Sequence, residues 1–143
     1  MKQNILLGKI ILAIYLADDK MALKFEYNSP ESAIIDTLIV LVDADCCSYT
    51  WIESVDNPEF LIGSPVLEAR DLDLLTPNDE VDGEVIQFYG FKLSTIKGSC
   101  TIDYRNSSNG YYGGNLVWPQ GDDSFYGGVF GGNVSKQVWN KIA

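Results

Sequence analysis

Histidine is absent from this 143-residue chain, and arginine is nearly absent. Without histidine, the protein lacks the side chain that most often serves as a general base or a metal ligand near neutral pH. The two arginines are Arg70 and Arg105, and 10 basic residues stand against 20 acidic ones, for a formal net charge of −10. Duplex DNA is therefore excluded as a ligand, because its binding requires a basic face. The acidic surface either maintains solubility or attracts a basic partner.

Cysteine is also scarce, with the adjacent pair Cys46 and Cys47 and a separate Cys100. An odd number does not make a disulfide framework, and a nucleophilic cysteine would need a base that the chain lacks. We therefore expect reduced, buried thiols in a cytoplasmic protein. The apolar run near the N-terminus is interrupted at Gly8 and Lys9 and is too short to span a membrane, so it predicts a buried strand and no membrane contact.

Sequence motifs for catalysis are missing. The chain has no glycine-rich phosphate loop, no dinucleotide fingerprint and no zinc-ligand spacing. Carboxylate pairs are numerous, but in so acidic a chain they give weak support to a phosphodiesterase or a glycosidase. The sequence therefore predicts a protein that binds without catalysing a reaction, with no catalytic residue, no metal and no cofactor.

Alternating apolar and polar residues predict a mostly antiparallel β-sheet. We expect strands over residues 9–17, 21–27, 33–42, 64–75, 85–98 and 99–105. The third of these is almost continuously apolar, which predicts burial on both faces. Asp45 or Ser48 can cap a short central helix that carries Tyr49, Trp51, Ile52 and Val55, and residues 134–143 are compatible with a C-terminal helix. The expected fold class is therefore α+β.

The chain changes character after residue 118. Residues 1–118 predict one β-rich ligand-binding domain, and residues 119–143 a glycine-rich extension. Pairs of glycines follow aromatic residues in this extension, and glycine allows close approach of the backbone to another surface. The extension is either an oligomer contact or a set of flexible turns.

The stretch Tyr104–Gly114, YRNSSNGYYGG, carries more polar groups than a turn needs. A hairpin turn requires only Asn109-Gly110. Arg105 adds a planar fork of donors suited to phosphate or carboxylate. The other surplus groups suit a base edge, a ribose or a stacked ring, and they come from Asn106, Ser107, Asn109, Tyr111 and Tyr112. Residue types alone do not distinguish between two interpretations of this stretch, a plain hairpin and the wall of a nucleotide pocket.

Two motifs, DADCCSYTWIE at Asp43–Glu53 and YRNSSNGYYGG at Tyr104–Gly114, resemble the phage anti-Thoeris proteins of the sponge type. Those proteins sequester glycocyclic ADP-ribose made by bacterial TIR-domain enzymes, and some are reported to hold cyclic oligonucleotides. The resemblance covers about residues 8–118. It implies a non-catalytic nucleotide sponge in the cytoplasm of the infected bacterium, assembled as a homo-oligomer built from dimers.

The resemblance also implies a site. Arg105 would contact a phosphate, Asn109 a base or ribose, and Tyr111 or Tyr112 would pack beside them. Because arginine is so scarce, further phosphate contacts are expected from Lys24, Lys92, Lys97 or backbone amides. Adenine would stack on one of the aromatic residues Trp51, Phe88, Tyr89 and Phe91. The full expected site comprises Arg105, Asn106, Ser107, Asn109, Tyr111, Tyr112, Phe88, Phe91 and Lys24. The alternative function is an acidic protein–protein inhibitor, whose target would be a host defence protein or a nucleic-acid-binding protein.

Overall fold

The computed structural model describes residues 4–44, 48–72, 84–108, 113–118 and 137–143. This part of the chain forms nine strands and one short 3₁₀ turn. The elements are β1 (Ile10–Ala17), β2 (Ala22–Asn28), β3 (Asp36–Ala44), β4 (Tyr49–Asp56), η1 (Pro58–Leu61), β5 (Glu68–Leu72), β6 (Val85–Thr95), β7 (Gly98–Ser108), β8 (Gly114–Val117) and β9 (Trp139–Lys141). The strands expected over residues 9–17, 21–27, 85–98 and 99–105 are confirmed.

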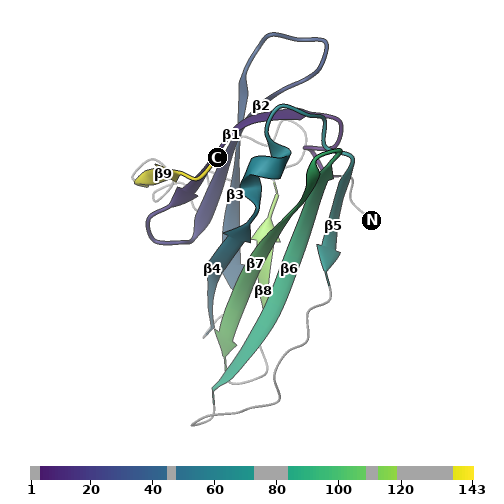
Figure 1. Cartoon of the computed structure of the whole chain (residues 1–143). Coiled ribbons are helices and arrows are strands. Elements are labelled where there is room, and N and C mark those ends of the chain that lie inside the picture. The colour runs from purple at the N-terminus through teal and green to yellow at the C-terminus, as the bar shows by residue number, and fades with distance from the viewer. Residues whose placement is uncertain (1–3, 45–47, 73–83, 109–112, 119–136) are drawn as a thin grey trace.

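The strands form two antiparallel sheets, ordered β8-β3-β2-β1-β9 and β4-β7-β6-β5. Figure 1 shows the four-stranded sheet in front of β3 and β8, with β9 beside β1. Apolar side chains from both sheets form one buried cluster, so the sheets pack face to face as a β-sandwich. On one side of the sandwich, β1 exchanges hydrogen bonds with the segment before β5, including Gly63 N to Ile11 O at 3.0 Å.

Alternation along the strands decides which side chains enter this core. Cys100, Ile102 and Tyr104 of β7 are buried, as their period of two predicts. In the opposite sheet, Leu23 and Phe25 of β2 are 0% and 1% exposed. β3 begins only at Asp36, and its first two residues are exposed. Burial on both faces is found only further along the strand, where Leu38 and Val40 lie in the main core and Leu41 is buried in a second apolar cluster.

The α+β fold class is wrong, because the described residues contain no α-helix. The expected central helix is strand β4, which pairs with β7. A β-bulge between Ile52 and Ser54 shifts the register, so both Ile52 and Val55 face the core although they are three residues apart. This spacing imitates the period of a helix, which is why the sequence pattern was misleading.

The expected C-terminal helix is also contradicted, because Trp139–Lys141 form β9, which pairs with β1. Ile14 N donates to Ala143 O at 2.8 Å, and Asp18 N donates to Val138 O at 2.8 Å. Strand pairing therefore holds the described end of the chain against the edge of the five-stranded sheet. The division of the chain at residue 118 stays a prediction. No helix in the described segments is long and apolar enough to cross a membrane.

Candidate functional site

The motif Tyr104–Gly114 begins as a strand, because β7 continues to Ser108. Successive side chains of a strand point to opposite faces. Tyr104, Asn106 and Ser108 are therefore buried between the sheets, whereas Arg105 and Ser107 lie on the outer face of the four-stranded sheet. The polar residues of one motif thus enter two separate environments.

Asn106 belongs to the interior. Its side chain is fully buried, and Nδ2 donates to Thr50 Oγ1 at 2.9 Å and to Ser48 Oγ at 3.2 Å. Its Oδ1 has no hydrogen-bond partner within the described part of the chain. This geometry ties β7 to the start of β4, and it does not bring Asn106 to the face that carries Arg105.

The glycine pair Gly113-Gly114 also has a packing role. A β-carbon on Gly114 would collide with the side chain of Thr50, and one on Gly113 would lie 2.9 Å from Tyr89 Oη. Because β8 pairs with β3 in the other sheet, its first residue must pass close to the inner face of β4. The close approach that glycine permits here is an approach to the chain's own side chains.

On the outer face, Arg105 is held by neighbours from three strands. Its guanidinium carbon lies 4.1 Å from the centre of the Phe88 ring, in cation–π geometry. Nη1 lies 3.3 Å from Glu53 Oε1, and Nη2 lies 3.5 Å from Asp103 Oδ2. Two carboxylates therefore neutralise this arginine, and a phosphate would have to compete with them.

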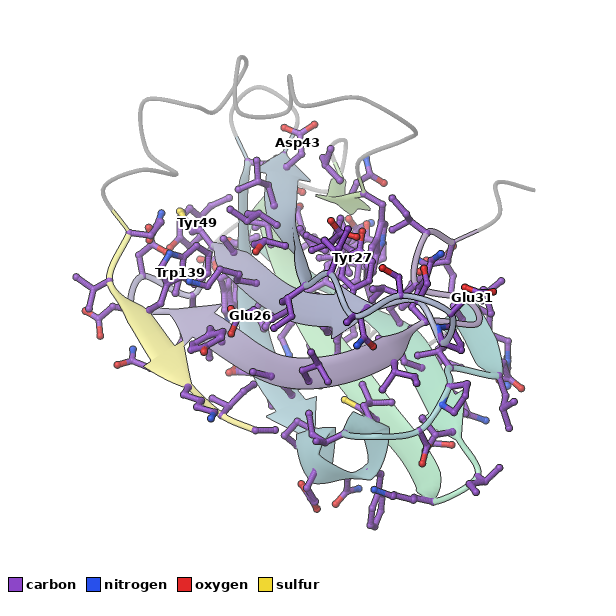
Figure 2. The ribbon with its side chains drawn as sticks, turned by 90° about the horizontal axis from the view of Figure 1, so that it is seen from above. Glu26, Tyr27, Glu31, Asp43, Tyr49 and Trp139 are labelled. Carbon is purple, nitrogen blue, oxygen red and sulfur yellow. The ribbon has the colours of Figure 1, made fainter. Side chains whose placement is uncertain are left out.

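An open groove of about 440 Å³ lies on this side of the molecule. Its lining residues come from the β1–β2 turn, β4, the start of β6 and β7, and they are Asp19, Lys20, Tyr49, Trp51, Glu84 and Ser107. The turn is fixed against β4 because Ile52 N donates to the carbonyl oxygen of Lys20 at 2.8 Å. Figure 2 shows Tyr49 on the same side of the molecule as β9 and Trp139, with Glu31 on the opposite side.

Two aromatic rings form the apolar part of this groove. The rings of Tyr49 and Trp51 stack with centroids 5.5 Å apart, and Tyr49 is 50% exposed. Residues i and i+2 of a strand share a face, and so both aromatic rings lie on the outer side of β4. A planar ligand can stack on such a surface, as bases do on aromatic side chains.

Polar groups complete the groove. Ser107 Oγ donates to Glu84 Oε1 at 2.6 Å, and this pair joins β7 to the start of β6. Among the described lining residues, Asp19 and Glu84 carry negative charge and Lys20 carries the one positive charge. The groove can therefore accept hydroxyl and amine donors more readily than it can accept a free phosphate.

The structure brings only part of the expected site together. Arg105 and Phe88 are direct cross-strand neighbours, and Ser107 shares their face.

Two other expected site residues lie elsewhere. Phe91 lies in the core, where its ring centre is 4.8 Å from that of Trp118. Lys24 lies on the outer face of the other sheet, with Nζ 4.5 Å from the Tyr15 ring centre and 5.0 Å from that of Trp139.

Other expected site residues, Asn109, Tyr111 and Tyr112, lie outside the described residues, as do Cys46 and Cys47. Sequence reasoning missed Lys20, Tyr49 and Glu84 as groove residues. The alternation of Tyr49 and Trp51 was the available signal, but it was assigned to a helix. Lys20 and Glu84 had no local signal, because they meet β4 only through the packing of separate segments.

The thiol of Cys100 lies in the core beneath the four-stranded sheet. Burial, with smaller contributions from Asp56 and Glu59, raises its pKa from the ordinary value of 9.0 to about 12. The expectation of a buried thiol is confirmed for this cysteine. A thiol that stays protonated at neutral pH is a poor nucleophile.

Fold and site together define an antiparallel β-sandwich with an open, aromatic-lined groove on the outer face of one sheet. The family model of the domain of unknown function DUF7448 matches residues 4–118, and the chain belongs to this family. No curated protein and no solved structure gives a significant match.

Proposed function

We propose that this protein is a non-catalytic sponge that sequesters a cyclic ADP-ribose-type nucleotide, such as glycocyclic ADP-ribose. In the cytoplasm of an infected bacterium, this sequestration would block TIR-based Thoeris defence. The observation that carries the proposal is the open groove with the stacked Tyr49–Trp51 pair and the adjoining Ser107–Glu84 hydrogen bond. The resemblance of the two motifs to sponge-type proteins is consistent with this function.

Stacking and hydrogen bonding supply the affinity in this proposal. A base stacked on an aromatic side chain contributes about 1–3 kcal/mol to binding. The polar rim offers the hydroxyl of Ser107 and the carboxylate of Glu84 to the sugar and base. Phe88 and Arg105 lie on the same face and extend the surface beyond the groove.

The proposed sponge is a homo-oligomer built from dimers. Small-molecule sites bury about 70–90% of their ligand, and an open groove leaves one side of its ligand uncovered. A second subunit placed over this face would provide the opposite wall, and a two-fold axis would generate two equivalent sites. Cyclic oligonucleotides are a further ligand class for the same face.

A retention experiment tests the proposal. Purified protein is mixed with glycocyclic ADP-ribose, passed over a membrane that retains only protein, and then boiled. Recovery of intact nucleotide from the boiled protein is the expected result, and Tyr49→Ala should lose it. Ile96→Ala, which changes a side chain that is 81% exposed on the β6–β7 turn, is the surface control. Free nucleotide in the filtrate would rule out sequestration, and altered nucleotide would identify an enzyme.

A second candidate is an acidic inhibitor of a basic protein. The observation in its favour is the charge around the groove, where the carboxylates of Glu53, Asp103, Glu84 and Asp19 outnumber the two cations described there, Arg105 and Lys20. Binding of this kind weakens steeply as salt is added. A synthetic peptide rich in arginine and lysine should then bind at low salt, be released by added salt, and be insensitive to Tyr49→Ala.

A further inference from the structure

We infer that the groove recognises the nucleoside part of its ligand, the planar base and the ribose hydroxyls, and that the phosphates contribute little to affinity. This inference rests on the proposed function. It assigns Tyr49 as the stacking surface and Glu84 as the acceptor for ribose hydroxyls. Tyr49 is the first residue of β4 and Glu84 directly precedes β6, and both line one groove together with Ser107 of β7.

The charges of the face argue against phosphate as the main recognition element. Arg105, which shares the outer face of β7 with the groove residue Ser107, already has its guanidinium nitrogens 3.3 Å from Glu53 and 3.5 Å from Asp103. Lys20 is the one cation in the described lining, which also contains the two carboxylates Asp19 and Glu84. A phosphate placed there would meet at least as much negative as positive charge, and the net charge of −10 opposes its approach.

Ribose hydroxyls fit the same groups. A carboxylate accepts hydrogen bonds from neighbouring sugar hydroxyls, as the acidic residue of dinucleotide sites does with the ribose 2′-hydroxyl. Glu84 Oε1 already accepts a hydrogen bond from the Ser107 hydroxyl at 2.6 Å, which shows that its carboxylate is oriented along the groove wall that β7 forms. Hydrogen bonds from neutral hydroxyls to a charged carboxylate are roughly twice as strong as hydrogen bonds between two neutral groups.

The other lining carboxylate is occupied by the chain itself. Asp19 Oδ1 accepts from Met21 N at 2.9 Å, and Asp19 Oδ2 accepts from Gln137 Nε2 at 3.1 Å. These bonds fix the β1–β2 turn and link it to the segment before β9. The assignment of ligand recognition therefore goes to Glu84, while Asp19 shapes the wall.

The Tyr49 ring has the geometry of a stacking surface. One side of it is covered by Trp51 at a centroid distance of 5.5 Å and an interplanar angle of 26°. With half of its surface exposed, the ring offers its remaining side to a base. A base stacked on Tyr49 would place its ribose within the same groove as Glu84.

Equilibrium dialysis with adenosine, 2′-deoxyadenosine and ADP-ribose tests this assignment. Adenosine and ADP-ribose should bind with dissociation constants within about threefold of each other, because the phosphates add little. Loss of the 2′-hydroxyl, or the change Glu84→Gln, should weaken binding about tenfold. Glu31→Gln, at an exposed carboxylate on the opposite side of the molecule, is the matched control and should leave binding unchanged.

The outcomes separate this inference from the proposed function. ADP-ribose binding without adenosine binding, or tighter ADP-ribose binding by Glu84→Gln, would overturn the nucleoside assignment while the sponge proposal stands. Tyr49→Phe should retain adenosine and Tyr49→Ala should lose it, because stacking needs the ring alone. If the wild-type protein binds none of the three ligands and also fails the retention experiment, both the assignment and the sponge proposal are wrong.

Discussion

The side-chain amide of Asn106 donates a hydrogen bond to Thr50 Oγ1 at 2.9 Å, entirely within the interior of the sandwich. This contact joins β7 to β4, the two strands whose outer faces carry the groove residues Ser107, Tyr49 and Trp51. A residue expected to contact a ligand thus holds the strands that present the site. Side chains of the same motif therefore contribute to function in different ways according to the face on which they lie.

Replacing Asn106 by alanine should destabilise the protein by about 1–3 kcal/mol, because the hydroxyls of Thr50 and Ser48 lose a buried donor. Chemical denaturation measures this change. Ser107→Ala, one residue along on the outer face, should change stability by no more than about 0.5 kcal/mol. An Asn106→Ala protein of unchanged stability that no longer retains nucleotide would instead place Asn106 in contact with the ligand.

Replacing Gly114 by alanine should also destabilise the fold, by about 1–3 kcal/mol, because the new β-carbon would collide with Thr50. Gly113→Ala should cost less, since its nearest contact is the terminal hydroxyl of Tyr89, the far end of a side chain. Thermal or denaturant unfolding of both variants provides the comparison. Combining Gly114→Ala with Thr50→Ser should recover part of the loss, because serine lacks the colliding methyl group of Thr50 and keeps only the hydroxyl. Equal stability of wild type and Gly114→Ala would contradict this packing.

Replacing Arg105 by glutamine should reduce nucleotide retention by less than about threefold, because the carboxylates of Glu53 and Asp103 already neutralise the charge of the guanidinium. Retention of glycocyclic ADP-ribose after filtration is the measurement. Lys24→Ala should have no effect on retention, since Lys24 packs between Tyr15 and Trp139 on the other sheet. Complete loss of retention by a folded Arg105→Gln protein would restore the direct phosphate contact that the family resemblance implies.

Stability should fall as the pH rises above 9, because the pKa of Cys100 is raised from 9.0 to about 12 in the folded protein. Between these values the unfolded chain releases the thiol proton and the folded chain keeps it, so ionisation favours unfolding. At pH 10.5 the contribution is about 2 kcal/mol. Tyr104 acts in the same direction, because burial raises its pKa from 10.0 to about 12.

Denaturant titrations at pH 8 and pH 10.5 measure this loss for the wild type and for Cys100→Ala. The alanine variant will be less stable at pH 8, because it leaves a small cavity, but it should lose about 2 kcal/mol less than the wild type between the two pH values. Tyr104 remains in both proteins, so its contribution to the pH dependence of stability cancels in the comparison. Parallel losses in the two proteins would show that the Cys100 thiol ionises normally in the fold.

The sequence predicts the parts of the fold that depend on local patterns, such as the alternation of side chains along one strand. The period of two at Cys100, Ile102 and Tyr104 depends only on strand geometry, and the buried face of β7 was correctly predicted from it. The helix expected around Trp51 failed because the bulge at Glu53 moves Val55 onto the core face. A bulge is specified by the partner strand as well as by the bulged residues, and the pairing of β4 with β7 is not visible in either segment alone.

The candidate site follows the same division. The acidic charge, the absence of histidine and the supply of aromatic and hydroxyl groups are set by composition, and so they can be read directly from the sequence. The burial of Asn106, the pairing of Arg105 with Glu53 and the groove between the β1–β2 turn and β4 arise only when the chain folds. These features arise where segments distant in the chain pack together, and the side of a strand on which a polar residue lies determines whether it supports the fold or faces a ligand.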